Sequence, residues 1–175
     1  MSSAAAEVKK NLTDLILECD IIPILVEKDL AIECCIRGYH VYQDQDIKIG
    51  NTLKASPETR VAALVEDKYA MAIKSEDKTI GHIPKDLSKI TYFFLKKDGK
   101  FNVKITGPRQ YSRDLIKGGM ELPCTYTYST TDEEVYGKLV ELVSEFMDSY
   151  YKRIQKLEEK TRRKRRKLLR KNRVR

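Results

Sequence analysis

The stretch Lys78-Thr-Ile-Gly-His-Ile-Pro-Lys-Asp-Leu-Ser88 contains the end of a strand, a junction and the start of a helix. Gly81 allows the backbone to bend or to approach another segment closely. Pro84 ends the strand pattern and favours the first position of a helix. Lys85 would then lie beside the unpaired amides of a helix start, which suits an anion such as a phosphate. The alternative is an ordinary strand-to-helix junction with a solvated lysine.

The composition is that of one folded domain without a membrane span. The chain has 175 residues, of which 41% are hydrophobic, enough for one core. No apolar run approaches the length of a membrane span, and the N-terminal residues lack the pattern of a signal peptide. The cysteines form no Cys-x-x-Cys pair, so we expect reduced thiols, no metal site and no cofactor at Cys19, Cys34, Cys35 and Cys124.

The net charge is divided unevenly along the chain. Residues 152–175 contain 14 Lys and Arg against 2 Asp and Glu, a net charge of +12. The other 151 residues contain 20 basic and 24 acidic residues, a net charge of −4. The formal charge of +8 therefore belongs to the C-terminal tail, and such a tail is typical of binding to nucleic acid or another polyanion.

The order of hydrophobic patterns predicts a mainly β protein with flanking helices, an α+β arrangement. Many short strands, one inserted helix over 87–96 and long loops favour a small β-barrel of the OB or SH3-like kind. Residues 1–30 would form an N-terminal helix and linker, 31–130 the barrel, and 131–175 a long basic C-terminal helix. Strands are expected at 32–38, 47–56, 67–73, 79–83, 101–106 and 120–128.

A helical pattern continues from Thr131, a candidate capping residue, to about residue 171. One apolar stripe of this helix would lie on the body of the domain. A second stripe has spacings of three and four, as at the a and d positions of a coiled coil, and consists of Val140, Val143, Met147, Tyr150, Ile154 and Leu157. The second stripe permits a homodimer through the C-terminal helix, or else a wider contact between the helix and the barrel.

The basic tail is the strongest compositional signal for function. Its densest part is the run Arg162, Arg163, Lys164, Arg165, Arg166 and Lys167. Such a run is typical of a nuclear localisation signal, of a segment that holds the phosphate backbone, or of both. We therefore expect a nuclear protein. A solubilising tail without a partner is the alternative.

Residues for catalysis are sparse. His40 and His82 are the only histidines, and the sequence contains none of the common hydrolase, metalloprotease or phosphate-loop motifs. Glu66 and Asp67 are adjacent and would point apart on a strand. We interpret the chain as a protein that is not an enzyme.

Several motifs in the middle of the chain resemble the HIRAN domain, a variant OB-like barrel. They are Ile36-Arg-Gly-Tyr-His-Val-Tyr42, Glu66-Asp-Lys-Tyr-Ala-Met-Ala-Ile73, Thr79-Ile-Gly-His-Ile-Pro-Lys-Asp-Leu87, Tyr111-Ser-Arg-Asp-Leu115 and Gly118-Gly-Met-Glu-Leu-Pro-Cys124. Their order and spacing are close to those of stand-alone animal proteins of this type.

The resemblance implies binding of single-stranded DNA, with a preference for a free 3′ end. By this resemblance Tyr42 would stack on a base, Asp67 would accept from the terminal hydroxyl, and His82 and Lys85 would lie near bases and phosphates. His40 stands where the family has an arginine. The chain also differs just before Asp67, where Glu66 adds negative charge beside the expected strand.

Two hypotheses follow. The first is a nuclear nucleic-acid-binding module that holds single-stranded DNA, or alternatively RNA, on the barrel face while the basic helix contacts phosphates. The second is a protein-interaction or scaffold module whose basic tail serves only as a nuclear localisation signal. The two differ in whether the barrel itself binds a strand.

Overall fold

The computed structural model describes residues 25–38 and 47–172. The expected N-terminal helix, His40 and Tyr42 lie outside these ranges. None of the helices in the described part of the chain is long and apolar enough to cross a membrane.

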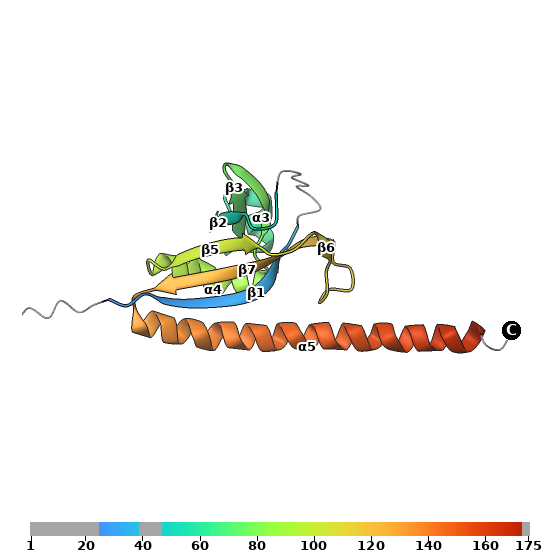
Figure 1. Ribbon diagram of the computed structural model, residues 1–175. Coiled ribbons are helices and arrows are strands. Elements are labelled where there is room, and N and C mark those ends of the chain that lie inside the picture. Colours follow the sequence, from blue (N-terminus) through green and yellow to red (C-terminus); the bar gives the residue numbers. More distant parts are fainter. Residues whose placement is uncertain (1–24, 39–46, 173–175) are drawn as a thin grey trace, which may run out of the picture.

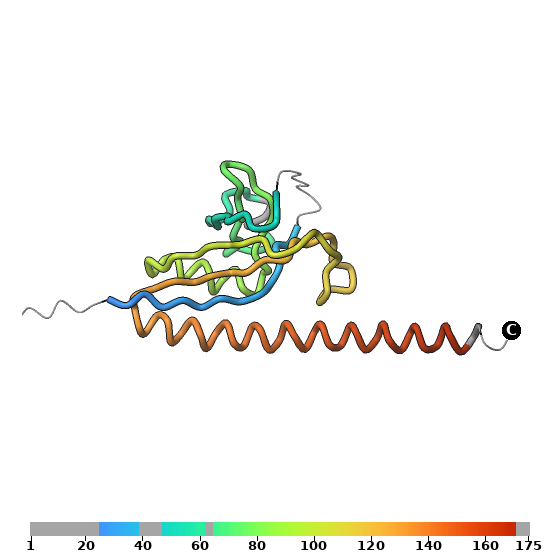
Figure 2. Tube along the Cα trace, in the orientation of Figure 1, coloured from blue at the N-terminus to red at the C-terminus, as the bar shows by residue number. Residues whose placement is uncertain are grey.

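An antiparallel sheet forms most of the domain (Figure 1). Its strands are β1 (Lys28–Ile36), β2 (Thr52–Pro57), β3 (Met71–Ser75), β4 (Lys78–His82), β5 (Lys100–Ile105), β6 (Gln110–Tyr111) and β7 (Met120–Thr130). The spatial order is β1-β7-β5-β2-β3-β4, with the short β6 paired to β7. The helices are α3 (Val61–Glu66), α4 (Lys85–Lys96) and α5 (Glu133–Asn172). In the trace of Figure 2, β1, β7 and β5 lie side by side below the part that contains β2, β3 and β4.

Within the described residues, a bridge between Arg37 and His82 links the two ends of this strand order. The backbone of Arg37, just after β1, forms an isolated antiparallel bridge with His82, the last residue of β4. The approach is so close that a Cβ atom on Gly81 would lie 2.6 Å from the carbonyl oxygen of Arg37 and 2.5 Å from Cγ2 of Ile36. The close approach predicted at Gly81 is confirmed, and the strands form a barrel-like α+β fold.

The core lies where β1, β5 and β7 bring alternating apolar side chains to one face. In the strand predicted over 101–106, buried Phe101, Val103 and Ile105 alternate with exposed residues. They pair with residues of β7 that include Tyr126 and Tyr128, both fully buried. The hydroxyl of Tyr128 lies 2.8 Å from that of Thr91, which connects the sheet to α4.

The C-terminal helix begins with a cap from Asp132 rather than from Thr131. The Oδ1 atom of Asp132 accepts hydrogen bonds from the backbone amides of Glu134 and Val135, so it satisfies two donors that the first turn leaves unpaired. The helix then runs beneath β1 and β7, contacts α4 and β7, and continues well beyond the sheet (Figure 1).

The inner half of α5 packs on the barrel of its own chain. The buried side chains are those of Leu139, Val143, Phe146, Tyr150 and Ile154. Three of these, Val143, Tyr150 and Ile154, belong to the stripe that was considered for a homodimer. The wider intramolecular contact, the alternative interpretation of that stripe, is what the structure contains.

Two local predictions were wrong. The strand expected over 67–73 begins only at Met71, because Asp67 starts a turn in which its carboxylate accepts from the amide of Tyr69 and its carbonyl from the amide of Ala70. The residues taken as the end of a linker instead begin β1, where Lys28 pairs with Thr130. The short helix α3, Val61–Glu66, lies between β2 and β3, where no element was predicted from the sequence.

Candidate nucleic-acid interface

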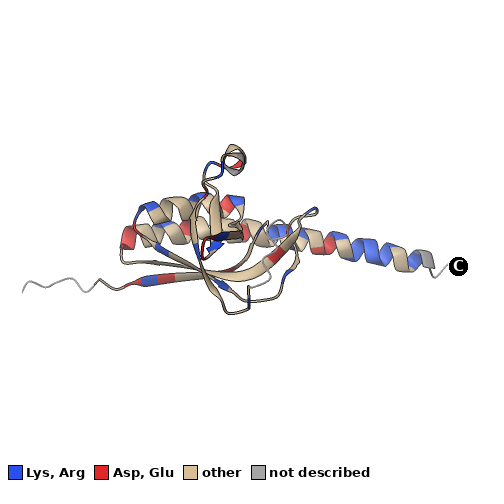
Figure 3. Ribbon diagram, turned by 90° about the horizontal axis from the view of Figure 1, so that it is seen from above, with Lys and Arg blue, Asp and Glu red and all other residues tan. Residues whose placement is uncertain are grey.

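The outer half of α5 is a continuous cationic helix. Between Lys160 and Asn172 it contains nine Lys and Arg residues and no Asp or Glu. Residues 160–170 are all exposed. Thirteen residues of α-helix span about 20 Å. Figure 3 shows these basic residues gathered on the part of α5 that extends past the barrel.

Three of the predicted site residues lie close together near the start of α4. His82 ends β4, and Lys85 is the first residue of α4. The Nζ atom of Lys85 donates to the backbone carbonyl of Glu66, at 2.8 Å, beside the turn that Asp67 begins. The structure thus brings together Lys85, His82 and Asp67, whereas His40 and Tyr42 lie outside the described residues.

A buried carboxylate positions the ring of His82. Glu58 is only 7% exposed, and its Oε2 atom lies 2.6 Å from Nε2 of His82. The same carboxylate accepts from the guanidinium of Arg60 and from the backbone amides of Thr59 and Arg60. The bond with Arg60 lowers the pKa of Glu58 most, burial opposes this, and His82 adds to the lowering, so the pKa lies well below its ordinary value.

Because Glu58 stays ionised, its carboxylate can only accept hydrogen bonds. His82 therefore donates through Nε2, which fixes the orientation of its ring at the end of β4. The sequence drew attention to His82 but not to Glu58. No local pattern predicts the contact between Glu58 and His82, because the two residues are 24 positions apart in the chain.

A second network of charged residues fixes α5 to the barrel. Arg37 donates to both carboxylate oxygens of Asp114, at 2.7 and 2.8 Å, and the side chain of Asp114 is fully buried. Arg153 of α5 donates to the same carboxylate at 3.1 Å and lies 3.4 Å from Asp86 in the first turn of α4. One carboxylate thus connects the end of β1, the loop after β6 and α5, and Arg153 extends the connection to α4.

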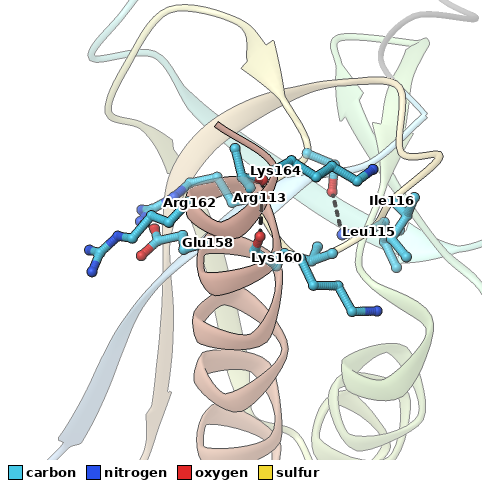
Figure 4. Close-up of a pocket in the computed structure, with 10 residues that line it drawn as sticks. Arg113, Leu115, Ile116, Glu158, Lys160, Arg162 and Lys164 are labelled. Carbon is cyan, nitrogen blue, oxygen red and sulfur yellow. Dashed lines mark hydrogen bonds and ion pairs between the residues drawn. The ribbon is translucent and has the colours of Figure 1, made fainter. Parts of the chain in front are cut away.

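A groove separates the loop after β6 from the start of the cationic segment (Figure 4). Its volume is about 630 Å³. Leu115, Ile116 and Leu157 supply apolar surface, while Lys160, Arg162 and Lys164 contribute positive charge. The loop side holds its shape through Ser112, whose hydroxyl bonds to Asp114 and accepts from the amide of Leu115. The groove extends the cationic surface of α5 onto the body of the domain.

The cysteines in the described part of the chain are buried thiols. Cys34, Cys35 and Cys124 form no disulfide, and burial raises the pKa of the Cys124 thiol well above its ordinary value. Within residues 25–38 and 47–172 no group of three or more His, Cys, Asp or Glu residues is placed to hold a metal ion.

These features define a barrel-like fold with a helix-initiating Ile-Pro-Lys junction and a C-terminal helix held by buried ion pairs. The structure is similar to the crystal structure of the HIRAN domain of human HLTF, with a TM-score of 0.50 and 11% sequence identity. The similarity covers 66% of this chain and 87% of that domain. No family model matches the sequence, and neither does any curated protein. The chain therefore has a HIRAN-like fold, as its motifs predicted.

Proposed function

We propose that this protein is a nuclear nucleic-acid-binding module that holds single-stranded DNA. The barrel edge around His82 and Lys85 would contact the strand, and the cationic half of α5 would contact phosphates. The observation that carries the proposal is the helical segment 160–172, which has nine basic residues and no acidic one and is exposed over residues 160–170. Lys and Arg side chains that contact phosphates release counterions, and this release supplies most of the affinity of such contacts.

The HIRAN-like fold supports a role for the barrel in this binding. The resemblance implies that Asp67, His82 and Lys85 lie at a strand-binding edge, and all three are found near the start of α4. Lys85 already donates to the carbonyl of Glu66, so a phosphate would compete with that bond or share the same ammonium group. An ammonium group has three donors, which makes sharing feasible.

The experiment compares two full-length charge variants by fluorescence anisotropy with labelled single-stranded DNA. In the first, Arg162, Arg163, Arg165 and Arg166 are changed to Gln. In the matched control, the exposed barrel residues Lys48, Lys54, Lys78 and Lys104 are changed to Gln, which removes the same net charge. For a single strand the salt slope falls by about 0.7 per lost phosphate contact, so the first variant should lose a slope of about 3.

The control should retain most of the slope of the unaltered chain. Equal losses in the two variants would mean that net charge alone attracts the strand, and would contradict a phosphate-binding helix. Strands of the same length in RNA, and DNA with a blocked 3′ end, establish which nucleic acid is preferred and whether the end is recognised.

A protein-interaction module is the second candidate, and the contacts of the barrel edge favour it. His82 is committed to Glu58 through Nε2, and Lys85 donates to Glu66. On this alternative the tail serves only as a nuclear localisation signal. A fluorescent fusion of the tail variant should then lose nuclear import, while the unaltered chain binds no single strand at moderate salt.

A further inference from the structure

An aromatic cluster lies on α4 and the turn before β3, next to the residues of the proposed barrel edge. Tyr92 and Phe93 belong to α4, and Tyr69 lies in the turn before β3. Phe93 is 48% exposed, although it is a large apolar residue. We call this cluster, with the lysines around it, the α4 aromatic surface: Lys68, Tyr69, Lys89, Tyr92, Phe93 and Lys96.

The three rings pack against one another. The ring centroids are 5.4 Å apart for Tyr69 and Tyr92, 5.2 Å for Tyr69 and Phe93, and 5.4 Å for Tyr92 and Phe93. The turn at Asp67 directs the chain so that Tyr69 lies against α4. The cluster is therefore held by two separate segments, and its rings are fixed in place before any partner arrives.

Lysines surround these rings. The ammonium groups of Lys68 and Lys89 lie 4.9 and 5.7 Å from the centroid of Tyr69, and that of Lys96 lies 5.6 Å from the centroid of Tyr92. All three lysines are exposed. The surface therefore combines positive charge with flat aromatic faces.

Helical periodicity places most of these side chains away from the core, although Tyr92 is half-buried and also packs against it. The buried residues of α4 are Leu87, Ser88, Thr91 and Phe94. At 100° per residue, Lys85, Lys89, Tyr92, Phe93 and Lys96 fall within a sector of about 100° on the other side. Core packing therefore contributes to the position of Tyr92 but does not explain the exposed ring of Phe93.

We propose that the α4 aromatic surface binds the bases of single-stranded nucleic acid, with its lysines on the neighbouring phosphates. Proteins that bind single strands combine aromatic side chains, on which bases stack, with cationic grooves that follow the backbone. A duplex hides the faces of its bases, so it could use only the lysines. This inference rests on the proposed function and names where bases stack on the chain.

The path from this surface to the cationic helix is short. Lys85 and Phe93 are eight residues apart on α4, about 12 Å along the helix. The first turn of α4 lies beside α5, where Asp86 meets Arg153. Lys160 follows seven residues later, about 10 Å further. One strand of a few nucleotides can therefore reach from the aromatic rings to the cationic half of α5.

The test measures anisotropy with the full-length chain and two labelled probes of equal length and charge. One is oligothymidine of about 12 nucleotides, within the usual range for single-strand sites, and the other is the same backbone without bases. The variant Phe93→Leu keeps apolar volume but removes the ring. Tyr151→Leu is the matched control, because Tyr151 is 50% exposed and lies outside the surface.

We expect Phe93→Leu to weaken binding of oligothymidine by about 5- to 100-fold, the usual range for the loss of one stacked base. Binding of the abasic probe should be unchanged, and Tyr151→Leu should affect neither probe. Thermal unfolding of each variant, followed by circular dichroism, verifies that the fold is intact.

Two outcomes would overturn the inference while leaving the proposed function in place. One is unchanged oligothymidine binding by Phe93→Leu, and the other is an equal loss for both probes. A labelled polyglutamate peptide serves as a third probe. If Phe93→Leu weakened binding of this peptide but not of oligothymidine, the surface would be assigned to an acidic protein instead. If the unaltered chain bound neither DNA nor RNA strands, the proposed function itself would fail, and the inference with it.

Discussion

Arg37 and His82 exchange both of their backbone hydrogen bonds, at 2.9 and 2.8 Å, and so join the end of β1 to the end of β4. Within the described residues, this pair is the isolated bridge that lies outside the named strands. The side chains of the same two residues belong to the two charge networks, through Asp114 and Glu58. The connection between the two ends of the sheet and the placement of the candidate interface therefore depend on the same residue pair, Arg37 and His82.

Substitution of Gly81 by Ala should destabilise the protein, because the new Cβ would lie 2.6 Å from a backbone oxygen and force the two strands apart. Overpacking of this kind costs about 1–3 kcal/mol. Urea unfolding measures the change. Gly137→Ala is the matched control: nothing lies within 4 Å of its Cβ, and alanine in a helix should add up to about 1 kcal/mol. Equal effects of the two substitutions would contradict the close approach.

Substitution of Asp114 by Ala should be among the most destabilising changes in the chain. It leaves the partly buried guanidinium of Arg37 without its bidentate partner and releases Arg153 of α5. Removal of one partner from a buried ion pair costs about 3–5 kcal/mol. Chemical denaturation should show this loss, whereas Asp148→Ala, at an exposed position of α5, should change stability by less than about 0.5 kcal/mol. A mild effect at Asp114 would mean that α5 is held by its apolar contacts alone.

Stability should depend on Glu58 in acid. The pKa of Glu58 is lowered on folding from an ordinary value of 4.5, so below that pH the unfolded chain binds more protons than the folded one. Its contribution is complete above about pH 4.5 and is lost as the pH falls further. The Glu58→Gln chain should be less stable at pH 7 and should vary less with pH in the acid range. Denaturation at a series of pH values, with exposed Glu145→Gln as the control, measures the difference.

The buried pair of Thr91 and Tyr128 should respond asymmetrically to substitution. The Thr91 hydroxyl donates to the carbonyl of Leu87, so the hydroxyl of Tyr128 donates to Thr91. Tyr128→Phe removes that donor and should cost about 1 kcal/mol. Thr91→Val leaves a buried tyrosine hydroxyl without its acceptor and should cost more, about 1–3 kcal/mol. Thermal unfolding of both variants provides the comparison, and a larger loss for Tyr128→Phe would reverse the assigned direction.

The protein should be a monomer at micromolar concentration. Val143, Tyr150 and Ile154 are buried within the same chain, which leaves Val140, Met147 and Leu157 as the half-buried remainder of the stripe. Light scattering is the suitable measurement, because the long α5 helix would give a misleading elution volume. If the unaltered protein had the mass of two chains and the Met147→Glu variant had the mass of one, the homodimer hypothesis would be supported instead.

The parts of the fold that the sequence predicted are those that depend on local pattern. The strands predicted over 79–83 and 101–106 and the helix predicted after Pro84 each follow from patterns of neighbouring residues. The start of β3 could not be predicted, since the strand propensity of Tyr69 competes with the turn that Asp67 stabilises.

The candidate site was predictable only in part for the same reason. The basic tail could be predicted from composition alone. The motif that contains His82 and Lys85 could be predicted because its residues are contiguous in the sequence. Glu58 contacts His82 across 24 residues and Asp114 contacts Arg37 across 77 residues, so no local pattern predicts these two contacts. The spacing of Lys89, Tyr92, Phe93 and Lys96 is visible in the sequence, but their orientation away from the core depends on which face of α4 the barrel covers.

The unbroken course of α5 has a consequence for how the protein reaches its partner. Starting a helix is costly and extending one is not, so the packed half of α5 nucleates the turns that the repelling charges of the outer half would not form alone. The charged segment is therefore rigid, and its orientation relative to the barrel is fixed. A ligand that contacts both the barrel and the charged segment must fit the fixed distance and angle between them. Binding should therefore depend on the shape of the ligand as well as on its charge.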